Sequence, residues 1–460
     1  NGCSSLKELI ISNFNTKLVD SMANMFYDCV NLTTLDLSGF ETPMLTTMYG
    51  MFYNCSKLQE LDLSKFDTSQ VMIMRNLFYG CAALTTLDIS SFVTDNVTDM
   101  GYMFSGCAAL PGLDLSGFNT AAVTDMGYMF YNCNGLLSLN VSGFVTDNVS
   151  NMMSMFYGCN KLTELDVSSF NTSKLNSMSN MFNRCESLAT LNLNNFNTDN
   201  VVSMASMFYN CKALFNLVID NFNTSKVKDF SYMFNNCTKV EVLNVGHFIT
   251  DAATTLQAMF YNCNKLQELN VSNWNTENVT NMSNTFYECG SLLKLDVSNW
   301  KTPLVTTFAG LFNGCRYVPR LNLSNFDTKS ATNLNSMFTK TSCDITFSNK
   351  DTSQVTSAFA MFNVFYGETI DLSGLDFSNC KDVRSFITIA DNLVNFIPPK
   401  NISYSIMLTA DYLSVESLLA IIDNLATVKN TQMLEIGETN IRKLTDEQLA
   451  VAIGKNWTVC

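Results

Sequence analysis

The stretch CVNLTTLDLSGFETPMLTTMYGMFYNC, residues 29–55, is one copy of a unit that the chain repeats many times. Its first and last residues belong to a column of cysteines at a fixed 26-residue interval: Cys3, Cys29, Cys55, Cys81, Cys107, Cys133, Cys159, Cys185, Cys211, Cys237, Cys263, Cys289 and Cys315. A constant period of this size is typical of solenoids, in which one short unit is stacked along an axis. We therefore expect function to reside on surfaces assembled across repeats.

The apolar residues of this unit change their spacing halfway along it. Residues 35–38 alternate apolar and polar side chains, which predicts a short strand with its leucines directed inward. Residues 48–55 place apolar side chains at i, i+3, i+4 and i+7, which predicts about two turns of helix. Because helix axes need about 8–10 Å and strands only about 4.8 Å, we expect a concave parallel sheet and short helical turns on the convex side.

Two further features of the repeat indicate structural rather than chemical roles. A threonine stands thirteen residues after every column cysteine, from Thr16 to Thr328, and its hydroxyl can satisfy turn backbone groups locally. The cysteines lack any CxxC pair, which removes the usual zinc and redox signatures. We expect them to be small, buried and reduced, although stacked neighbours are close enough for disulfides and the redox compartment stays open.

The composition excludes several classes of function. With 27 Lys plus Arg against 41 Asp plus Glu, the net charge of -14 argues against nucleic acid and anionic membranes as partners. No apolar run approaches the roughly 18 residues of a spanning helix, so direct membrane insertion is not expected. No signal peptide opens the sequence, but it begins inside a repeat, so we expect residues upstream. A single histidine, His247, and the absence of a phosphate loop predict no enzyme and no cofactor.

The Leu-x-x-Leu-x-Leu pattern, with Phe-x-x-Cys closing each unit, resembles the leucine-rich repeats of BspA-like surface proteins. Residues 123–148, VTDMGYMFYNCNGLLSLNVSGFVTDN, show it clearly, and the match extends from residue 3 to about 380. The resemblance implies an α/β leucine-rich-repeat solenoid used outside the cell for adhesion or recognition, without catalysis. Such proteins occur on bacterial surfaces and in bacteriophage virions, and the C-terminal tail resembles endings found in phage tail proteins.

The pattern weakens toward the C-terminus, which predicts two regions: a solenoid over residues 1–397, degenerate from about 339, and a small α/β capping region over residues 398–460. Cys343 is out of register by two, which indicates a shortened coil. Pro398 and Pro399 mark the boundary. Helix start signals follow at Ser414 and at Thr445, and strands are expected near 406–410, 432–437 and 456–459.

The outward residue between the two strand leucines forms what we call the aspartate column: Asp36, Asp62, Asp88, Asp114, Asn140, Asp166, Asn192, Asn244, Asn270, Asp296 and Asn322. Adjacent carboxylates at strand spacing repel one another. Solvation and neighbouring hydroxyls, a partner, or a hard cation such as calcium could each relieve this, although calcium needs six to eight oxygens. As partner-binding candidates we take Asp36, Asp62, Asp88, Asp114 and Asp166.

A second line of side chains, the tyrosine stripe, lies two residues before the column cysteines: Tyr27, Tyr53, Tyr79, Tyr131, Tyr157, Tyr209, Tyr261 and Tyr287. On the expected helix this position is turned away from the buried face. Exposed tyrosines in a row suit contacts with protein or sugar, whereas stacking along the axis is the structural alternative. The sequence leaves both interpretations open.

These observations predict a non-enzymatic extracellular recognition or adhesion module of a bacterial cell surface or a phage virion, which helps to engage a host. Its partner would be a protein or a cell-surface glycan, with assembly onto other surface or virion proteins also open. The alternative is a structural spacer or assembly unit of a larger structure. A repeat surface has no diagnostic pocket, so the sequence does not name the ligand.

Overall fold

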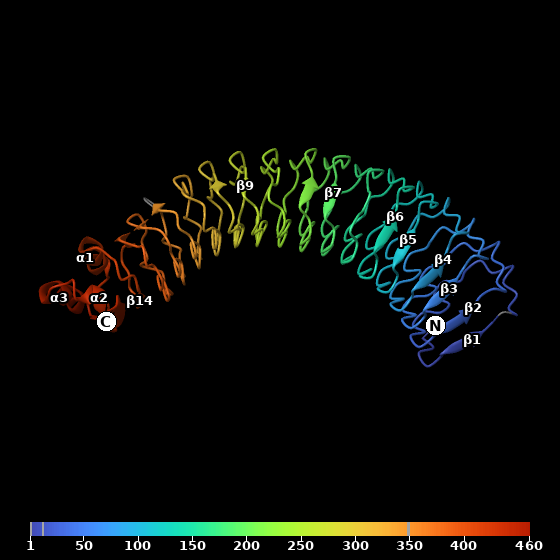
Figure 1. Ribbon diagram of the computed structural model, residues 1–460, viewed down its shortest axis with the longest axis horizontal. Coiled ribbons are helices and arrows are strands. Elements are labelled where there is room, and N and C mark those ends of the chain that lie inside the picture. Colours follow the sequence, from blue (N-terminus) through green and yellow to red (C-terminus); the bar gives the residue numbers. More distant parts are fainter. Residues whose placement is uncertain (1, 12, 347–349) are drawn as a thin grey trace. The chain divides into compact units, whose positions relative to one another are not determined.

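The computed structural model describes residues 2–11, 13–346 and 350–460. These residues form two compact units, Asn1–Lys226 and Val227–Cys460, each built from coils stacked in parallel (Figure 1). Strand pairs within each unit are parallel and connect residues one repeat apart, as in Leu9 with Leu35 and Leu269 with Leu295. The predicted solenoid of parallel strands is therefore confirmed for each unit.

The strands are short, and an apolar residue in each repeat strand, such as Leu61, Leu113 or Ile370, faces the core. The first unit contains β1 (Glu8–Ile10), β2 (Thr34–Asp36), β3 (Glu60–Asp62), β4 (Thr86–Asp88), β5 (Gly112–Asp114), β6 (Ser138–Asn140), β7 (Thr190–Asn192) and β8 (Asn216–Val218). The second contains β9 (Glu268–Leu269), β10 (Lys294–Leu295), β11 (Ile345–Thr346), β12 (Thr369–Asp371), β13 (Asn395–Ile397), β14 (Ile406–Met407), α1 (Val415–Asn424), β15 (Gln432–Glu435), α2 (Glu438–Ile441), α3 (Asp446–Gly454) and β16 (Trp457–Val459).

The helix expected over residues 48–55 is wrong, because this half of the coil is a run of turns. The amide of Met51 donates to the carbonyl of Met48 at 3.1 Å, which closes a turn rather than a helical i→i−4 bond. The amides on either side of Met51 point to the next coil instead: Gly50 N–H donates to the Arg75 carbonyl and Phe52 N–H to the Leu77 carbonyl, both at 3.0 Å. The coils thus have a backbone hydrogen-bond ladder on the turn side as well as on the strand side.

A helix does not form here because the backbone is left-handed at two positions of every coil, five residues and one residue before the column cysteine. In the first unit these residues are Asn24, Gly50, Asn76, Tyr102, Tyr128, Ser154, Asn180 and Ser206, then Asp28, Asn54, Gly80, Gly106, Asn132, Gly158, Arg184 and Asn210. A positive φ ends a right-handed helix, and Asn and Gly adopt it most readily. The convex side was expected to spread because helix axes need about 8–10 Å, and without helices this reason no longer applies. Neighbouring coils are close on this side, where Tyr27 and Tyr53 stack with 4.4 Å between their ring centroids.

Each core is filled by columns of like side chains. The structure describes all sixteen cysteines as free thiols, and those from Cys29 to Cys315 are buried as expected. Their thiols find carbonyl partners, as in Cys133 Sγ donating to the Phe104 carbonyl at 3.1 Å. Trp274 and Trp300 replace phenylalanines of the core and donate their indole N–H groups to the Val245 and Val271 carbonyls.

The threonine column is buried and structural, but it acts between coils rather than locally. The Thr120 hydroxyl donates to the Val145 carbonyl at 2.8 Å and accepts from the Val145 amide at 2.8 Å. Thr68 makes the same pair of contacts with Val93. Each threonine hydroxyl of this kind therefore links its own turn to the backbone of the following coil.

The shortened coil is confirmed in the second unit. Parallel bridges there join residues 24 apart, Arg320 with Asp344 and Asn333 with Ser357. Thr341 stands 26 residues after Cys315, at the position of the column cysteine, and Cys343 is buried, with 1% of its surface exposed. The loss of two residues after Thr341 explains why Cys343 is out of register.

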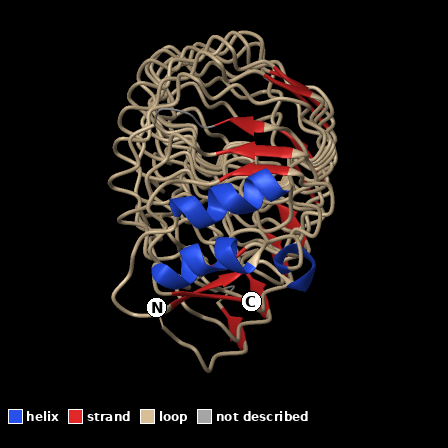
Figure 2. Cartoon of the chain, turned by 90° about the vertical axis from the view of Figure 1, so that its left-hand side faces the viewer, coloured by secondary structure: helices blue, strands red, loops and turns tan. Residues whose placement is uncertain are grey.

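The C-terminal residues form a different arrangement within the second unit, where α1 and α3 lie side by side (Figure 2). The predicted caps are present: the Ser414 side chain accepts from the Ser417 amide, and Thr445 and Gln448 form a capping box. Strands β14, β15 and β16 form a parallel sheet, and α1 contacts β13. Among the described residues, no helix combines the length and apolar character that crossing a membrane requires.

Candidate functional site

The outward strand face carries the aspartate column, and its members are exposed. The carboxylates of the column also close local turns: Asp36 Oδ1 accepts from the Ser38 amide at 2.9 Å, and Asp166 Oδ1 accepts from the Ser168 amide at 2.9 Å. Asn140 accepts in the same way from the Ser142 amide. This Asx-turn role explains why Asp and Asn exchange freely in the column.

These hydrogen bonds stabilise the ionised carboxylates. Hydrogen bonding from the Ser38 side chain, and then from its amide, lowers the pKa of Asp36, and Ser168 acts in the same way on Asp166. Ser64 and Ser116 likewise lower the pKa values of Asp62 and Asp114. The aspartates of the column are thus negatively charged at neutral pH, and Asp36, Asp62 and Asp166 each keep one carboxylate oxygen for solvent or a partner. Among the described residues, no group of three or more His, Cys, Asp or Glu side chains could hold a metal ion.

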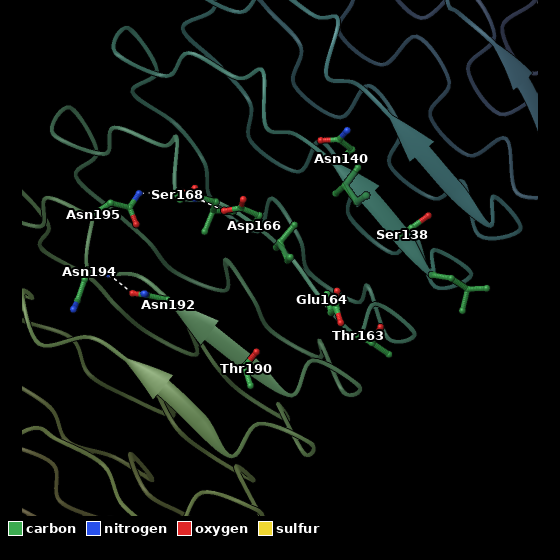
Figure 3. Close-up of a pocket in the computed structure, with 14 residues that line it drawn as sticks. Ser138, Asn140, Thr163, Glu164, Asp166, Ser168, Thr190, Asn192, Asn194 and Asn195 are labelled. Carbon is green, nitrogen blue, oxygen red and sulfur yellow. Dashed lines mark hydrogen bonds between the residues drawn. The ribbon is translucent and has the colours of Figure 1, made fainter.

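The strand face of the first unit contains a hollow of about 710 Å³ between β6 and β7 (Figure 3). It is lined by outward polar groups, by the exposed Leu137 and by apolar residues of the inward set: Leu137, Ser138, Leu139, Asn140, Thr163, Glu164, Leu165, Asp166, Val167, Ser168, Thr190, Asn192, Asn194 and Asn195. Because Leu139 and Leu165 belong to the inward set, the hollow reaches between neighbouring coils rather than only lying above them.

The coil in the middle of this hollow lacks the strand pairing of its neighbours. Residues 163–166 form no strand, and their backbone N–H and C=O groups make no hydrogen bond among the described residues. The equivalent β3 pairs in register with β4, and the Thr85 amide donates to the Gln59 carbonyl there at 2.8 Å. Asn195 reaches into the gap and donates to the Val167 and Phe170 carbonyls, both at 2.9 Å.

The tyrosine stripe is half-buried, and its members stack on one another. Tyr53 lies between Tyr27 and Tyr79, with 4.4 Å between centroids on each side, and Tyr131 stacks on Tyr157 at 4.6 Å. The stacking alternative is therefore confirmed for these rings. Burial raises the pKa of Tyr53 to about 12. Ring faces used for stacking are closed to a sugar, so the stripe offers a partner mainly ring edges and hydroxyls.

The sequence interpretation missed the continuation of this stack where the stripe lacks a tyrosine. Tyr102 and Tyr128, three residues earlier in their coils, stack on each other at 4.5 Å and connect Tyr79 with Tyr131. Arg75 lies over the Tyr102 ring at 5.1 Å. The signal available in the sequence is that tyrosine occupies the earlier position in the coil where Ser105 replaces the usual tyrosine.

Three solved structures with similar folds are a leucine rich cell surface protein from Faecalibacterium prausnitzii A2-165, an LRR protein from Leptospira interrogans, and the functional domain of InlJ from Listeria monocytogenes, which includes a cysteine ladder. The first is 16% identical, with a TM-score of 0.30, and the match covers 70% of this chain and 74% of that one. The second is 14% identical, with a TM-score of 0.24 and coverage of 94% and 95%. The third is 15% identical, with a TM-score of 0.18 and coverage of 94% and 70%.

A comparison with curated proteins finds no match to the chain. One family model matches in five overlapping segments: residues 1–61, 56–164, 135–248, 189–292 and 254–375. Together these segments span residues 1–375, which include the predicted BspA-like repeats. The chain therefore belongs to the family described as "Mycoplasma protein of unknown function, DUF285".

Proposed function

We propose that this chain is a non-enzymatic extracellular recognition or adhesion module of a bacterial surface or a phage virion, and that it binds a protein or a glycan through its outward strand face. The carrying observation is the aspartate column. Its local turns use only part of each side chain, so a repeated row of charged and amide groups remains exposed. Binding over many weak, regularly spaced contacts suits such a surface.

The experiment compares two charge-neutralised variants of the whole chain. One changes five column residues of the first unit to asparagine, which preserves their Asx turns: Asp36, Asp62, Asp88, Asp114 and Asp166. The control removes charge on the turn side through Asp95→Asn, Asp147→Asn and Asp199→Asn; these carboxylates accept from asparagine amides of the next coil. Arrays of extracellular proteins and glycans, and intact bacterial cells, serve as targets. Loss of binding in the first variant alone supports the proposal, and equal binding by both variants contradicts it.

The spacer alternative is favoured by a separate observation, the presence of backbone ladders on both sides of the coil. Residue Met48 on the turn side and residue Leu63 on the strand side both donate to the next coil at 3.0 Å. Hydrogen bonding on two sides resists bending of a coil against its neighbour. Light scattering over a concentration series tests this role: stable self-assembly without any ligand would favour a spacer, and a monomer that binds an array target would favour recognition.

A further inference from the structure

We propose that the hollow between β6 and β7 is a docking site for an extended peptide segment that carries an arginine or lysine side chain. This inference rests on the proposed recognition function and specifies both the place on the strand face and the chemistry of the ligand. The hollow lies wholly within the first unit.

The unpaired strand segment favours a peptide. Residues 163–166 present backbone donors and acceptors that neither adjacent coil uses. These groups lie between β6 and β7, and the hollow reaches between the coils, so a long basic side chain of a bound peptide can enter it and donate to the free carbonyl groups. Leu137, which is 57% exposed at the rim, adds an apolar contact for one side chain of such a segment.

The side chains of the hollow favour a positive charge on that peptide. Glu164 and Asp166 are two residues apart on the segment, so both carboxylates face outward on the same side. Among the described residues that line the hollow there is no lysine or arginine. Asp166 Oδ1 is occupied by the Ser168 amide, whereas the Glu164 carboxylate has no hydrogen-bond partner among the described residues. A guanidinium, with its planar fork of donors, is suited to two adjacent carboxylates.

Amide groups border the two carboxylates on both sides. Asn192 directs its Oδ1 atom to the Asn194 amide, which leaves its Nδ2 group to donate toward a ligand, whereas the Asn140 side chain also hydrogen-bonds to Asp114. A free amide donor therefore lies beside the acceptors at Asn192, where it matches a peptide carbonyl next to a basic side chain. An anionic ligand would meet two carboxylates without a compensating cation.

The chain supplies a matched control. Glu60 and Asp62 in β3 repeat the Glu-Leu-Asp sequence of residues 164–166, but that strand is paired with β4. We compare Glu164→Gln/Asp166→Asn with Glu60→Gln/Asp62→Asn in the whole chain. Asparagine occupies the aspartate position in neighbouring coils, at Asn140 and Asn192, so the site variant keeps its Asx turn; equal melting temperatures of the two variants check this.

The probes are fluorescein-labelled Gly/Ser heptapeptides with a central arginine, lysine or citrulline, and maltoheptaose represents neutral glycans. We expect the arginine peptide to bind, with a dissociation constant that rises about tenfold or more in the 164/166 variant and less than about twofold in the 60/62 variant. Citrulline should weaken binding as much as the site variant does.

Four outcomes overturn the inference: no binding of the basic peptides, equal binding of the citrulline peptide, equal loss in both variants, or binding of maltoheptaose at this site in place of peptide. If the basic peptides fail while the five-aspartate variant still loses an array target, this inference falls and the proposed recognition function stands. If the five-aspartate variant keeps its target while the heptapeptide behaves as expected, the wider strand face is not the recognition surface.

Discussion

Replacement of Thr120 by valine tests how the coils are held together. Thr120 is fully buried, and its hydroxyl makes two hydrogen bonds of 2.8 Å with the Val145 amide and carbonyl. Valine has nearly the same shape but leaves both Val145 groups without their partner. Each orphaned group costs about 1–3 kcal/mol when buried. Since Val145 is 41% exposed and water can reach part of this backbone, we expect a total loss of about 2–4 kcal/mol.

The measurement is hydrogen exchange at the Val145 amide, because a stack of repeats need not unfold in one step. A loss of about 2–4 kcal/mol predicts exchange about thirtyfold to a thousandfold faster. Thr120→Ser is the control: it keeps the hydroxyl and loses only one methyl, at a cost of about 1 kcal/mol. If the valine variant protects this amide as well as the serine variant does, the threonine hydroxyls do not link the coils and the reasoning fails.

Three further changes have definite expected outcomes. Ile73→Thr should raise the free energy of unfolding by about 0.5–1 kcal/mol. At the equivalent position of another coil, the Asp125 side chain accepts a hydrogen bond from the amide of Gly127, two residues later, whereas the Ile73 side chain has no acceptor atom; an unchanged melting temperature would contradict this. Burial raises the pKa of Cys133 and Cys185 from the ordinary value of 9.0 to about 12, so these thiols ionise in the unfolded chain before they ionise in the folded one, and stability should fall progressively between about pH 9 and pH 12. Melting temperatures that stay level over this range would refute the reasoning, and Cys133→Ala should make the fall of melting temperature with pH less steep. Deletion of residues 398–460 should cause more aggregation than deletion of the coil 123–148, because it uncovers β13, which α1 contacts; the reverse order of soluble monomer yield by size exclusion would show that residues 398–460 are not a cap.

The strand half of the coil could be predicted because its signal is local and unambiguous. The alternation around Leu35 and Leu37 has one interpretation, and the strict interval fixes which leucines pair. The turn half could not be predicted from apolar spacing alone, since two successive turns place side chains inward at the same intervals as a helix. The distinguishing signal was the residue before the cysteine, which is Asn or Gly in most coils, such as Asn54 and Gly80, and which favours a left-handed backbone.

Of the candidate sites, the aspartate column could be predicted from local sequence and the hollow could not. The exposure of the aspartate column follows from strand alternation, and its Asx turns follow from the serine two residues later. The hollow does not follow from local sequence: Glu164-Leu165-Asp166 repeats the pattern of paired β3, and the difference depends on neighbours such as Asn195, whose side chain holds two carbonyls of this coil. Contacts between residues 25 to 28 positions apart decide the outcome, and no single repeat contains them.

The double backbone ladder also has an evolutionary consequence. A gene of tandem repeats can gain or lose whole repeats, and such a change leaves every remaining coil stacked in register on a coil of the same kind. A change of one residue inside a coil instead shifts one ladder against the other, unless it falls where both can absorb it, as the loss beside Thr341 does. Lineages of this protein should therefore differ in length by multiples of one coil far more often than by single residues, and the reach of the strand face can be selected separately from its chemistry.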